Sequence, residues 1–181
     1  MNFFDYFLLI IATFGNLPYQ LNTVSNLELP QYMGNWHHIY TNKITEMLVG
    51  ENISCLSTQY KIMDEPFQDK FSINYQGNLN DTIISTNGMG YTKNISEPGT
   101  ISVDLLSEGV SFDYFILDNG PIVNEQYQYS IITDEYGIFL YVLIRELSEF
   151  TKYQKDIDQV LENYNFTDYF RKPIILDHTN C

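Results

Sequence analysis

Eight short apolar or alternating segments follow one another along the middle of the chain, separated by turn residues. They cover residues 36–41, 55–63, 71–76, 82–94, 101–106, 112–117, 127–133 and 138–145. Side chains of a strand alternate between its two faces, so the second segment places Leu56, Thr58, Tyr60 and Ile62 on one face. Short strands at such regular spacing predict an antiparallel sandwich or an up-and-down barrel.

The pattern changes to a helical one after the last of these strands. An apolar stripe at helical spacing is formed by Tyr153, Ile157, Val160, Leu161 and Tyr164. Thr151 followed by Gln154 matches a capping box, which predicts that the helix begins there. Charged residues fill the other positions, so we expect one amphipathic α-helix packed on the outside of the sheet.

The charge of the chain narrows its possible partners. Its 23 acidic and 9 basic residues give a net charge of −14. Such a surface repels phosphate backbones and anionic headgroups, so we expect no nucleic-acid partner and no stable membrane insertion. The 15 Tyr and 12 Phe residues among 181 argue against disorder. With no internal repeat or linker, the length fits one domain.

The first fifteen residues form a separate segment. Their apolar run, Phe3–Ala12, is shorter than the roughly 20 residues of a membrane span and resembles the core of a signal peptide, although no basic residue precedes it. We therefore expect a signal peptide at 1–15, a single domain at 16–181 and secretion. The alternative is an N-terminal strand or helix packed on the domain.

Cysteines and sequons are consistent with a secretory route. The two cysteines, Cys55 and Cys181, allow one intramolecular disulfide, which an even count in a secreted protein favours. The tail after the helix, residues 165–181, would then run back across the domain to reach Cys55. Four Asn-x-Ser/Thr sequons are candidate glycosylation sites: Asn52, Asn80, Asn94 and Asn165. Chance matches that are never modified are the alternative for any one of them.

Several short motifs occur in a fixed order along the chain. They are Tyr32–Trp36 (YMGNW), Asn52–Tyr60 (NISCLSTQY), Asn94–Gly99 (NISEPG), Tyr114–Leu117 (YFIL) and Tyr141–Arg145 (YVLIR). With the helix and the terminal cysteine after them, this order resembles the lipocalin family, and within it the apolipoprotein D and bacterial-lipocalin group. The resemblance covers residues 29–181. It implies an all-β fold: an eight-stranded antiparallel up-and-down barrel with a C-terminal α-helix packed outside.

The resemblance also assigns a structural role at one end of the barrel. Gly34 permits close backbone packing where the chain enters the barrel. Trp36 and Arg145 are implied to close the floor, with the guanidinium over the indole ring in a cation–π contact. These three residues are barrel-closing and do not bind ligand.

The other end of the barrel is the expected functional end. An eight-stranded barrel leaves room for one small ligand. The resemblance directs Tyr60, Tyr114 and Tyr141 inward, and alternation places Leu56 with Tyr60 and Ile116 with Tyr114. We therefore expect a secreted carrier that holds a fatty acid, sterol, retinoid or pigment among these five residues. The alternative is that these tyrosines fill a packed core, with the barrel acting as a protein-interaction module.

Enzymatic readings have weaker support. His37 and His38 are adjacent on a strand and face opposite sides, and His178 lies in the tail, so we interpret all three as ordinary surface or rim residues with no metal site. Cys55, the candidate nucleophile, would be consumed by the disulfide. We expect no catalytic residue and no cofactor. A lipocalin-fold enzyme acting on a lipid is the alternative.

One apolar segment at the expected cavity mouth is a candidate contact for a second partner. Residues 42–54 are predicted to form the first loop over the mouth, and they include Ile44, Met47, Leu48 and Val49. Such an apolar lid could gate a ligand, or contact a receptor or a membrane.

Overall fold

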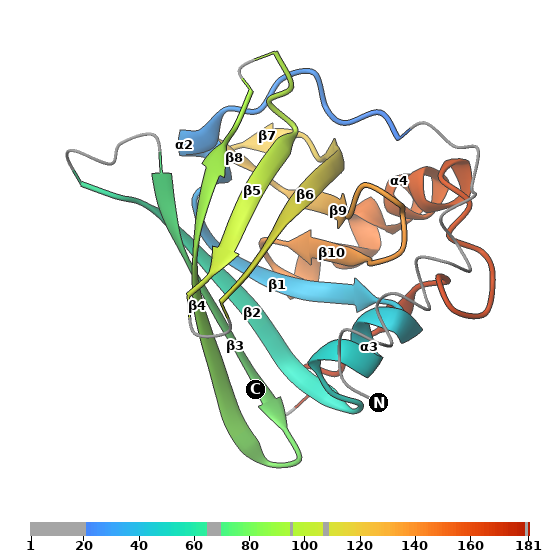
Figure 1. The fold of residues 1–181 in the computed structure, drawn as a ribbon. Coiled ribbons are helices and arrows are strands. Elements are labelled where there is room, and N and C mark those ends of the chain that lie inside the picture. Colours follow the sequence, from blue (N-terminus) through green and yellow to red (C-terminus); the bar gives the residue numbers. More distant parts are fainter. Residues whose placement is uncertain (1–20, 65–69, 95, 107–108, 180) are drawn as a thin grey trace.

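A computed structural model of the chain describes residues 21–64, 70–94, 96–106, 109–179 and 181. The expected signal peptide, 1–15, lies outside the described residues. Eight antiparallel strands form the barrel: β1 Gly34–Thr41, β2 Ile53–Ile62, β3 Lys70–Leu79, β4 Thr82–Thr92, β5 Thr100–Leu105, β6 Val110–Asn119, β9 Tyr129–Thr133 and β10 Tyr141–Ile144. Each pairs with its neighbour in this order, and β10 pairs with β1 to close the barrel. The predicted fold class is confirmed (Figure 1).

Shorter elements surround the barrel. Helix α2 (Leu29–Tyr32) precedes β1, and α3 (Lys43–Val49) follows it at the opposite end of the barrel (Figure 1). Strands β7 (Ile122–Val123) and β8 (Gln126–Tyr127) form a hairpin between β6 and β9. Strand β11 (Ile174–Ile175) pairs with the end of β1 and brings the C-terminal tail onto the sheet.

The last predicted strand starts later than expected. Residues 138–140 were expected to be part of it, but β10 begins at Tyr141. The carboxylate of Asp134 accepts hydrogen bonds from the backbone N–H groups of Ile138 and Phe139, at 2.7 and 2.9 Å. These two N–H groups are therefore committed to the turn and are not available to a strand ladder.

Helix α4 (Phe150–Asn163) packs outside the barrel, as the apolar stripe predicts. Tyr153, Ile157 and Leu161 are buried against outward-facing residues of the strands, including Ile131 and Val142. The predicted capping box is wrong. The 3-10 turn η1 (Leu147–Glu149) leads directly into α4, so the N-cap position falls on Glu149 and no side chain caps the helix.

Candidate functional site

One end of the barrel is closed by a stacked pair of side chains. The guanidinium carbon of Arg145 lies 3.7 Å from the ring centroid of Trp36, and Trp36 donates from its indole nitrogen to the carbonyl of Tyr32 at 2.9 Å. Arg145 donates four hydrogen bonds of 2.8–3.0 Å to backbone carbonyls, those of Gln31, Tyr32, Asn35 and Tyr127. One side chain therefore ties β1, β8 and α2 together. This is the closed end.

Gly34 is required at the closed end for two reasons. Its φ of +104° is a conformation that residues with a side chain rarely adopt. A Cβ atom there would also lie 3.1 Å from a guanidinium nitrogen of Arg145. The glycine thus leaves room for the guanidinium to reach the carbonyl of Asn35 on β1.

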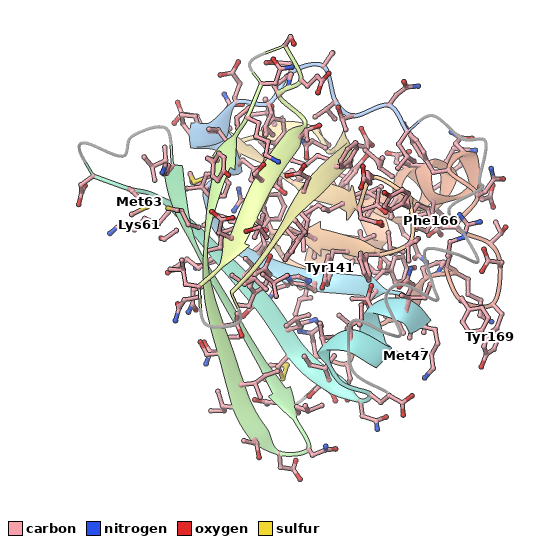
Figure 2. The ribbon with its side chains drawn as sticks, viewed as in Figure 1. Met47, Lys61, Met63, Tyr141, Phe166 and Tyr169 are labelled. Carbon is pink, nitrogen blue, oxygen red and sulfur yellow. A yellow bond between two sulfur atoms is a disulfide. The ribbon has the colours of Figure 1, made fainter. Side chains whose placement is uncertain are left out.

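A layer of tyrosines crosses the middle of the barrel interior. The hydroxyls of Tyr75 on β3 and Tyr114 on β6 are hydrogen-bonded to each other, and Tyr60 on β2 lies in the same buried cluster. The ring of Tyr141 lies edge-on to that of Tyr114, with centroids 6.1 Å apart, and Figure 2 shows Tyr141 in the centre of the molecule. The three tyrosines expected to contact ligand therefore come together, with Tyr75 as a fourth member.

His38 belongs to the same layer, which corrects the interpretation of the histidines as surface or rim residues. Its side chain is 1% exposed, and its ring lies edge-on to Tyr141 at a centroid distance of 5.3 Å. Its Nε2 is 2.6 Å from the hydroxyl of Thr58 on the neighbouring strand, and its Nδ1 is buried with no hydrogen-bond partner. We call His38, Thr58, Tyr60, Tyr75, Tyr114 and Tyr141 the polar layer.

Sequence reasoning missed Tyr75 and His38, although a signal existed for both. Tyr75 follows Phe71 and Ile73 at period two, and both of these are buried in the interior. His38 shares the inward face of β1 with Trp36. The same alternation rule that placed Tyr141 inward applies to them.

The polar layer separates two unlike halves of the interior. Toward the closed end, Ile116 and Leu143 are completely buried, and Ile101, which pairs with Tyr114, is buried as well. Toward the other end, which we call the open half, Leu105 and Phe112 are half-buried although they pack against the same cluster. Ile116, expected to contact ligand, therefore lies in the packed half.

Leu56 and Ile62 also lie away from the tyrosines. Leu56 packs at the open end of β2 in a separate small cluster with Ile53 and Leu176. Ile62, expected on the inward face, is 38% exposed at the far end of the same strand. Of the five expected ligand contacts, the three tyrosines therefore lie together. Ile116 lies on the closed side of them and Leu56 on the open side.

The polar layer carries no charge at neutral pH. Burial lowers the pKa of His38 to about 3, so its imidazole is neutral. Burial likewise raises the pKa of Tyr141 to about 12 and holds the pKa values of Tyr60, Tyr75 and Tyr114 well above their usual range. The layer thus offers neutral hydrogen-bonding groups within an aromatic surface.

The segment over the open end is a helix, not the loop that was expected. Asn42 caps α3 by accepting from the backbone N–H of Thr45 at 2.9 Å, and its amide donates to the carbonyl of Ile138 at 2.7 Å. Ile44 is 1% exposed and therefore belongs to the core. Only part of the expected apolar lid is available to a partner: Met47 is 46% exposed and lies on α3 (Figure 2).

The predicted disulfide between Cys55 and Cys181 is confirmed. The tail reaches Cys55 along the outside of the barrel, where the backbone N–H of Cys55 donates to the carbonyl of Asp177 and His178 contacts the carbonyl of His38. The Cys55 thiol is therefore not a free nucleophile. Within the described ranges, no group of three or more His, Cys, Asp or Glu side chains lies close enough to hold a metal ion.

The four sequon asparagines, Asn52, Asn80, Asn94 and Asn165, are all exposed. Each is thus accessible to a glycosylating enzyme, and their modification stays a prediction. In the part of the chain that the structure describes, no helix is long and apolar enough to cross a membrane.

Comparison with known proteins establishes the fold. No protein-family model matches the chain, and no curated protein matches it. Among solved structures, it is similar to insecticyanin from the tobacco hornworm Manduca sexta, with a TM-score of 0.67, 15% sequence identity, and coverage of 90% of this chain and 86% of that chain. The chain therefore has the lipocalin fold. The narrower resemblance to the apolipoprotein D and bacterial group stays a prediction.

Proposed function

We propose that this protein is a secreted carrier that binds one small hydrophobic ligand in the open half of its barrel and performs no chemistry on it. The observation that carries this proposal is the contrast in burial along the interior. Leu105 and Phe112 face inward but are half-buried, whereas residues two or four positions away on the same strands are fully buried. Inward apolar surface that the protein leaves uncovered is surface that a lipophile can cover.

The layered interior supports one position for the ligand within this proposal. Tyr60, Tyr114 and Tyr141, with Tyr75 and His38, form the base of the site, and the apolar walls rise from there toward α3. Tyrosine suits such a base because it combines apolar area with a hydroxyl that orients a ligand. Burying ~300 Å² of ligand surface at roughly 25 cal/mol per Å² contributes about 7 kcal/mol, which is of the order needed for micromolar binding.

Secretion and domain organisation belong to the same proposal. Disulfides persist in oxidising compartments, and this chain carries one that joins residues 126 positions apart. Four exposed sequons and an N-terminal apolar run typical of a signal peptide agree with that route. We therefore assign residues 1–15 to the signal peptide and 16–181 to the lipocalin domain.

A filled-barrel interaction module is the second candidate, and one observation favours it. The hydrogen-bonded hydroxyls of Tyr75 and Tyr114 join opposite walls of the barrel, so side chains fill the interior at that level. In this reading, Met47 on α3 and the neighbouring loops contact a protein partner. The two candidates differ in what they require of the open half: only the carrier needs it to be accessible.

Two single substitutions distinguish the carrier from the interaction module. Leu105→Trp and Phe112→Trp fill the open half, and each should weaken at least tenfold the binding of those members of a panel of fatty acids, sterols and retinoids that bind the unmodified protein, as measured by isothermal titration. Ile83→Trp is the matched control, since Ile83 is 68% exposed on β4 and binding should be unchanged. If no member of the panel binds the unmodified protein at micromolar concentration, the interaction module is the better assignment.

A further inference from the structure

The polar layer has a hydrogen-bonding capacity that the protein itself does not use. His38 Nδ1 is buried and has no partner, while Nε2 of the same ring contacts Thr58. Buried polar groups are nearly always hydrogen-bonded, so such an exception needs an explanation. The ring packs between Tyr75 and Tyr141, and both of these side chains remain half-buried. A ligand group at this level would therefore meet an imidazole nitrogen and phenol hydroxyls.

Within the described part of the chain, no buried cation lies at this level. Among the described residues, the buried cations are Arg145 and Arg171. Arg145 lies at the closed end with four backbone carbonyls as partners, and Arg171 is bonded to Asp168 in the tail. Lys43, at the start of α3, is paired with Glu46 and Glu51.

We infer that the site selects a neutral lipophile with a single hydroxyl or carbonyl group and rejects the corresponding carboxylate. The polar group lies against His38, Tyr75 and Tyr114, and the apolar body extends through the open half toward α3. This inference rests on the proposed carrier function and specifies its ligand class.

The selectivity has a simple electrostatic cause. A carboxylate taken from water into this layer loses its hydration and finds no positive charge to replace it. The protein's net charge of −14 adds to this penalty. A hydroxyl or a ketone loses far less on leaving water, and hydrogen bonds to neutral donors and acceptors replace what it loses.

The test compares ligands that differ only in the polar group. Decan-1-ol and decanoate, and retinol and retinoate, are titrated at pH 7.4 by displacement of one fluorescent lipophile. We expect the alcohol of each pair to bind at least tenfold more tightly. The difference should shrink as the pH falls toward 5, since decanoate becomes partly protonated. A carboxylate that binds as tightly as its alcohol at pH 7.4 overturns the inference and leaves the carrier function standing. If neither member of either pair binds, the carrier function itself fails.

Two conservative variants locate the selectivity in the polar layer. Tyr75→Phe and Tyr114→Phe each remove one hydroxyl and keep the ring, so affinity for decan-1-ol should fall three- to tenfold while affinity for decanoate changes little. Tyr169→Phe is the matched control, because Tyr169 is 66% exposed in the tail and points away from the barrel (Figure 2). If the ratio of alcohol affinity to carboxylate affinity is unchanged in both variants, the polar layer does not contact the polar group of the ligand.

Discussion

The closed end and the open half of the barrel use the same strands in different ways. On β5, Ile101 and Val103 are 3% and 0% exposed, whereas Leu105, two residues further along, is half-buried. On β6, Ile116 is fully buried and Phe112 is not. Since strand pairing continues through both halves, the difference lies in what fills the interior. The closed end is packed by the protein's own side chains, and the open half leaves part of its wall uncovered.

Buried side-chain atoms without a hydrogen-bond partner occur in both regions, since Gln31 on α2 and Asn119 at the end of β6 carry them near the closed end. At the closed end, Arg145 has four backbone partners and stacks on Trp36. In the polar layer, His38 keeps one nitrogen without a partner. Satisfied buried hydrogen bonds stabilise a fold, and an unpartnered buried atom leaves capacity for another group. The contacts of Arg145 therefore support a stabilising role for it, and the nitrogen of His38 supports the proposed binding above the tyrosines.

The largest effect is expected from Arg145→Ala, which tests the role of the floor. It removes four charge-assisted hydrogen bonds to backbone carbonyls and the stacking on Trp36, and only the Tyr32 carbonyl keeps a side-chain donor, the indole N–H of Trp36. We expect the free energy of unfolding in urea to fall by about 4 kcal/mol. Ligand affinity, corrected for the folded fraction, should stay the same.

Arg171→Ala is the control for this substitution. Arg171 is also buried, but its ion-pair partner is the single carboxylate of Asp168 in the tail. Its loss should cost about 1 kcal/mol. If both substitutions lower the free energy of unfolding equally, Arg145 stabilises the fold no more than Arg171 does.

The next largest effect comes from two substitutions on β5, which test directly the difference in packing between the two halves of the barrel. Ile101→Ala and Leu105→Ala each remove a large aliphatic side chain from the inward face of β5. The first leaves a cavity in the packed half and should cost about 3 kcal/mol, and the second should cost about 1 kcal/mol because its side chain is already partly solvated. Chemical denaturation measures both. If the two costs are similar, the open half is as tightly packed as the closed end, and the carrier function loses its main support.

Much of the barrel was predictable because its strands are local patterns. Alternation identifies most of the strands, and the resemblance of the motifs directs Tyr60, Tyr114 and Tyr141 inward, where the structure brings them together. The motif order added the pairing of Trp36 with Arg145 and hence the closed end. These features depend on period-two spacing and on a few large side chains, both of which a single sequence displays.

The features that were not predicted depend on contacts between distant segments. Helix α3 is only seven residues long, and it is held by the bond from Asn42 to Ile138, 96 residues away. The burial of His38 is decided by Thr58 on the neighbouring strand and by two aromatic rings from β3 and β10. Neither the register that brings these groups together nor the seating of α3 is visible in a local pattern.

A further effect concerns His38, which lies between the two halves, and its measure is pH dependence. Its pKa is about 3 in the folded protein because burial disfavours the charged form, against 6.5 for an ordinary histidine. Between these values the unfolded chain binds one proton that the folded protein does not, so His38 makes stability fall as the pH falls below about 6.5. From pH 7 to pH 5 this contribution is about 2 kcal/mol. Burial raises the pKa values of Asp118 and Asp134, which act in the opposite direction. The pH profile of the unmodified protein alone therefore does not isolate His38.

The variant His38→Gln isolates the histidine, because it retains both aspartates. Its loss of stability between pH 7 and pH 5 should be about 2 kcal/mol smaller than that of the unmodified protein. A ligand bound against His38 keeps the imidazole buried and neutral, so it should protect the unmodified protein at pH 5 without reducing this difference. Identical pH profiles for the two proteins would place His38 in contact with water, and the polar layer would then be open to solvent from the mouth.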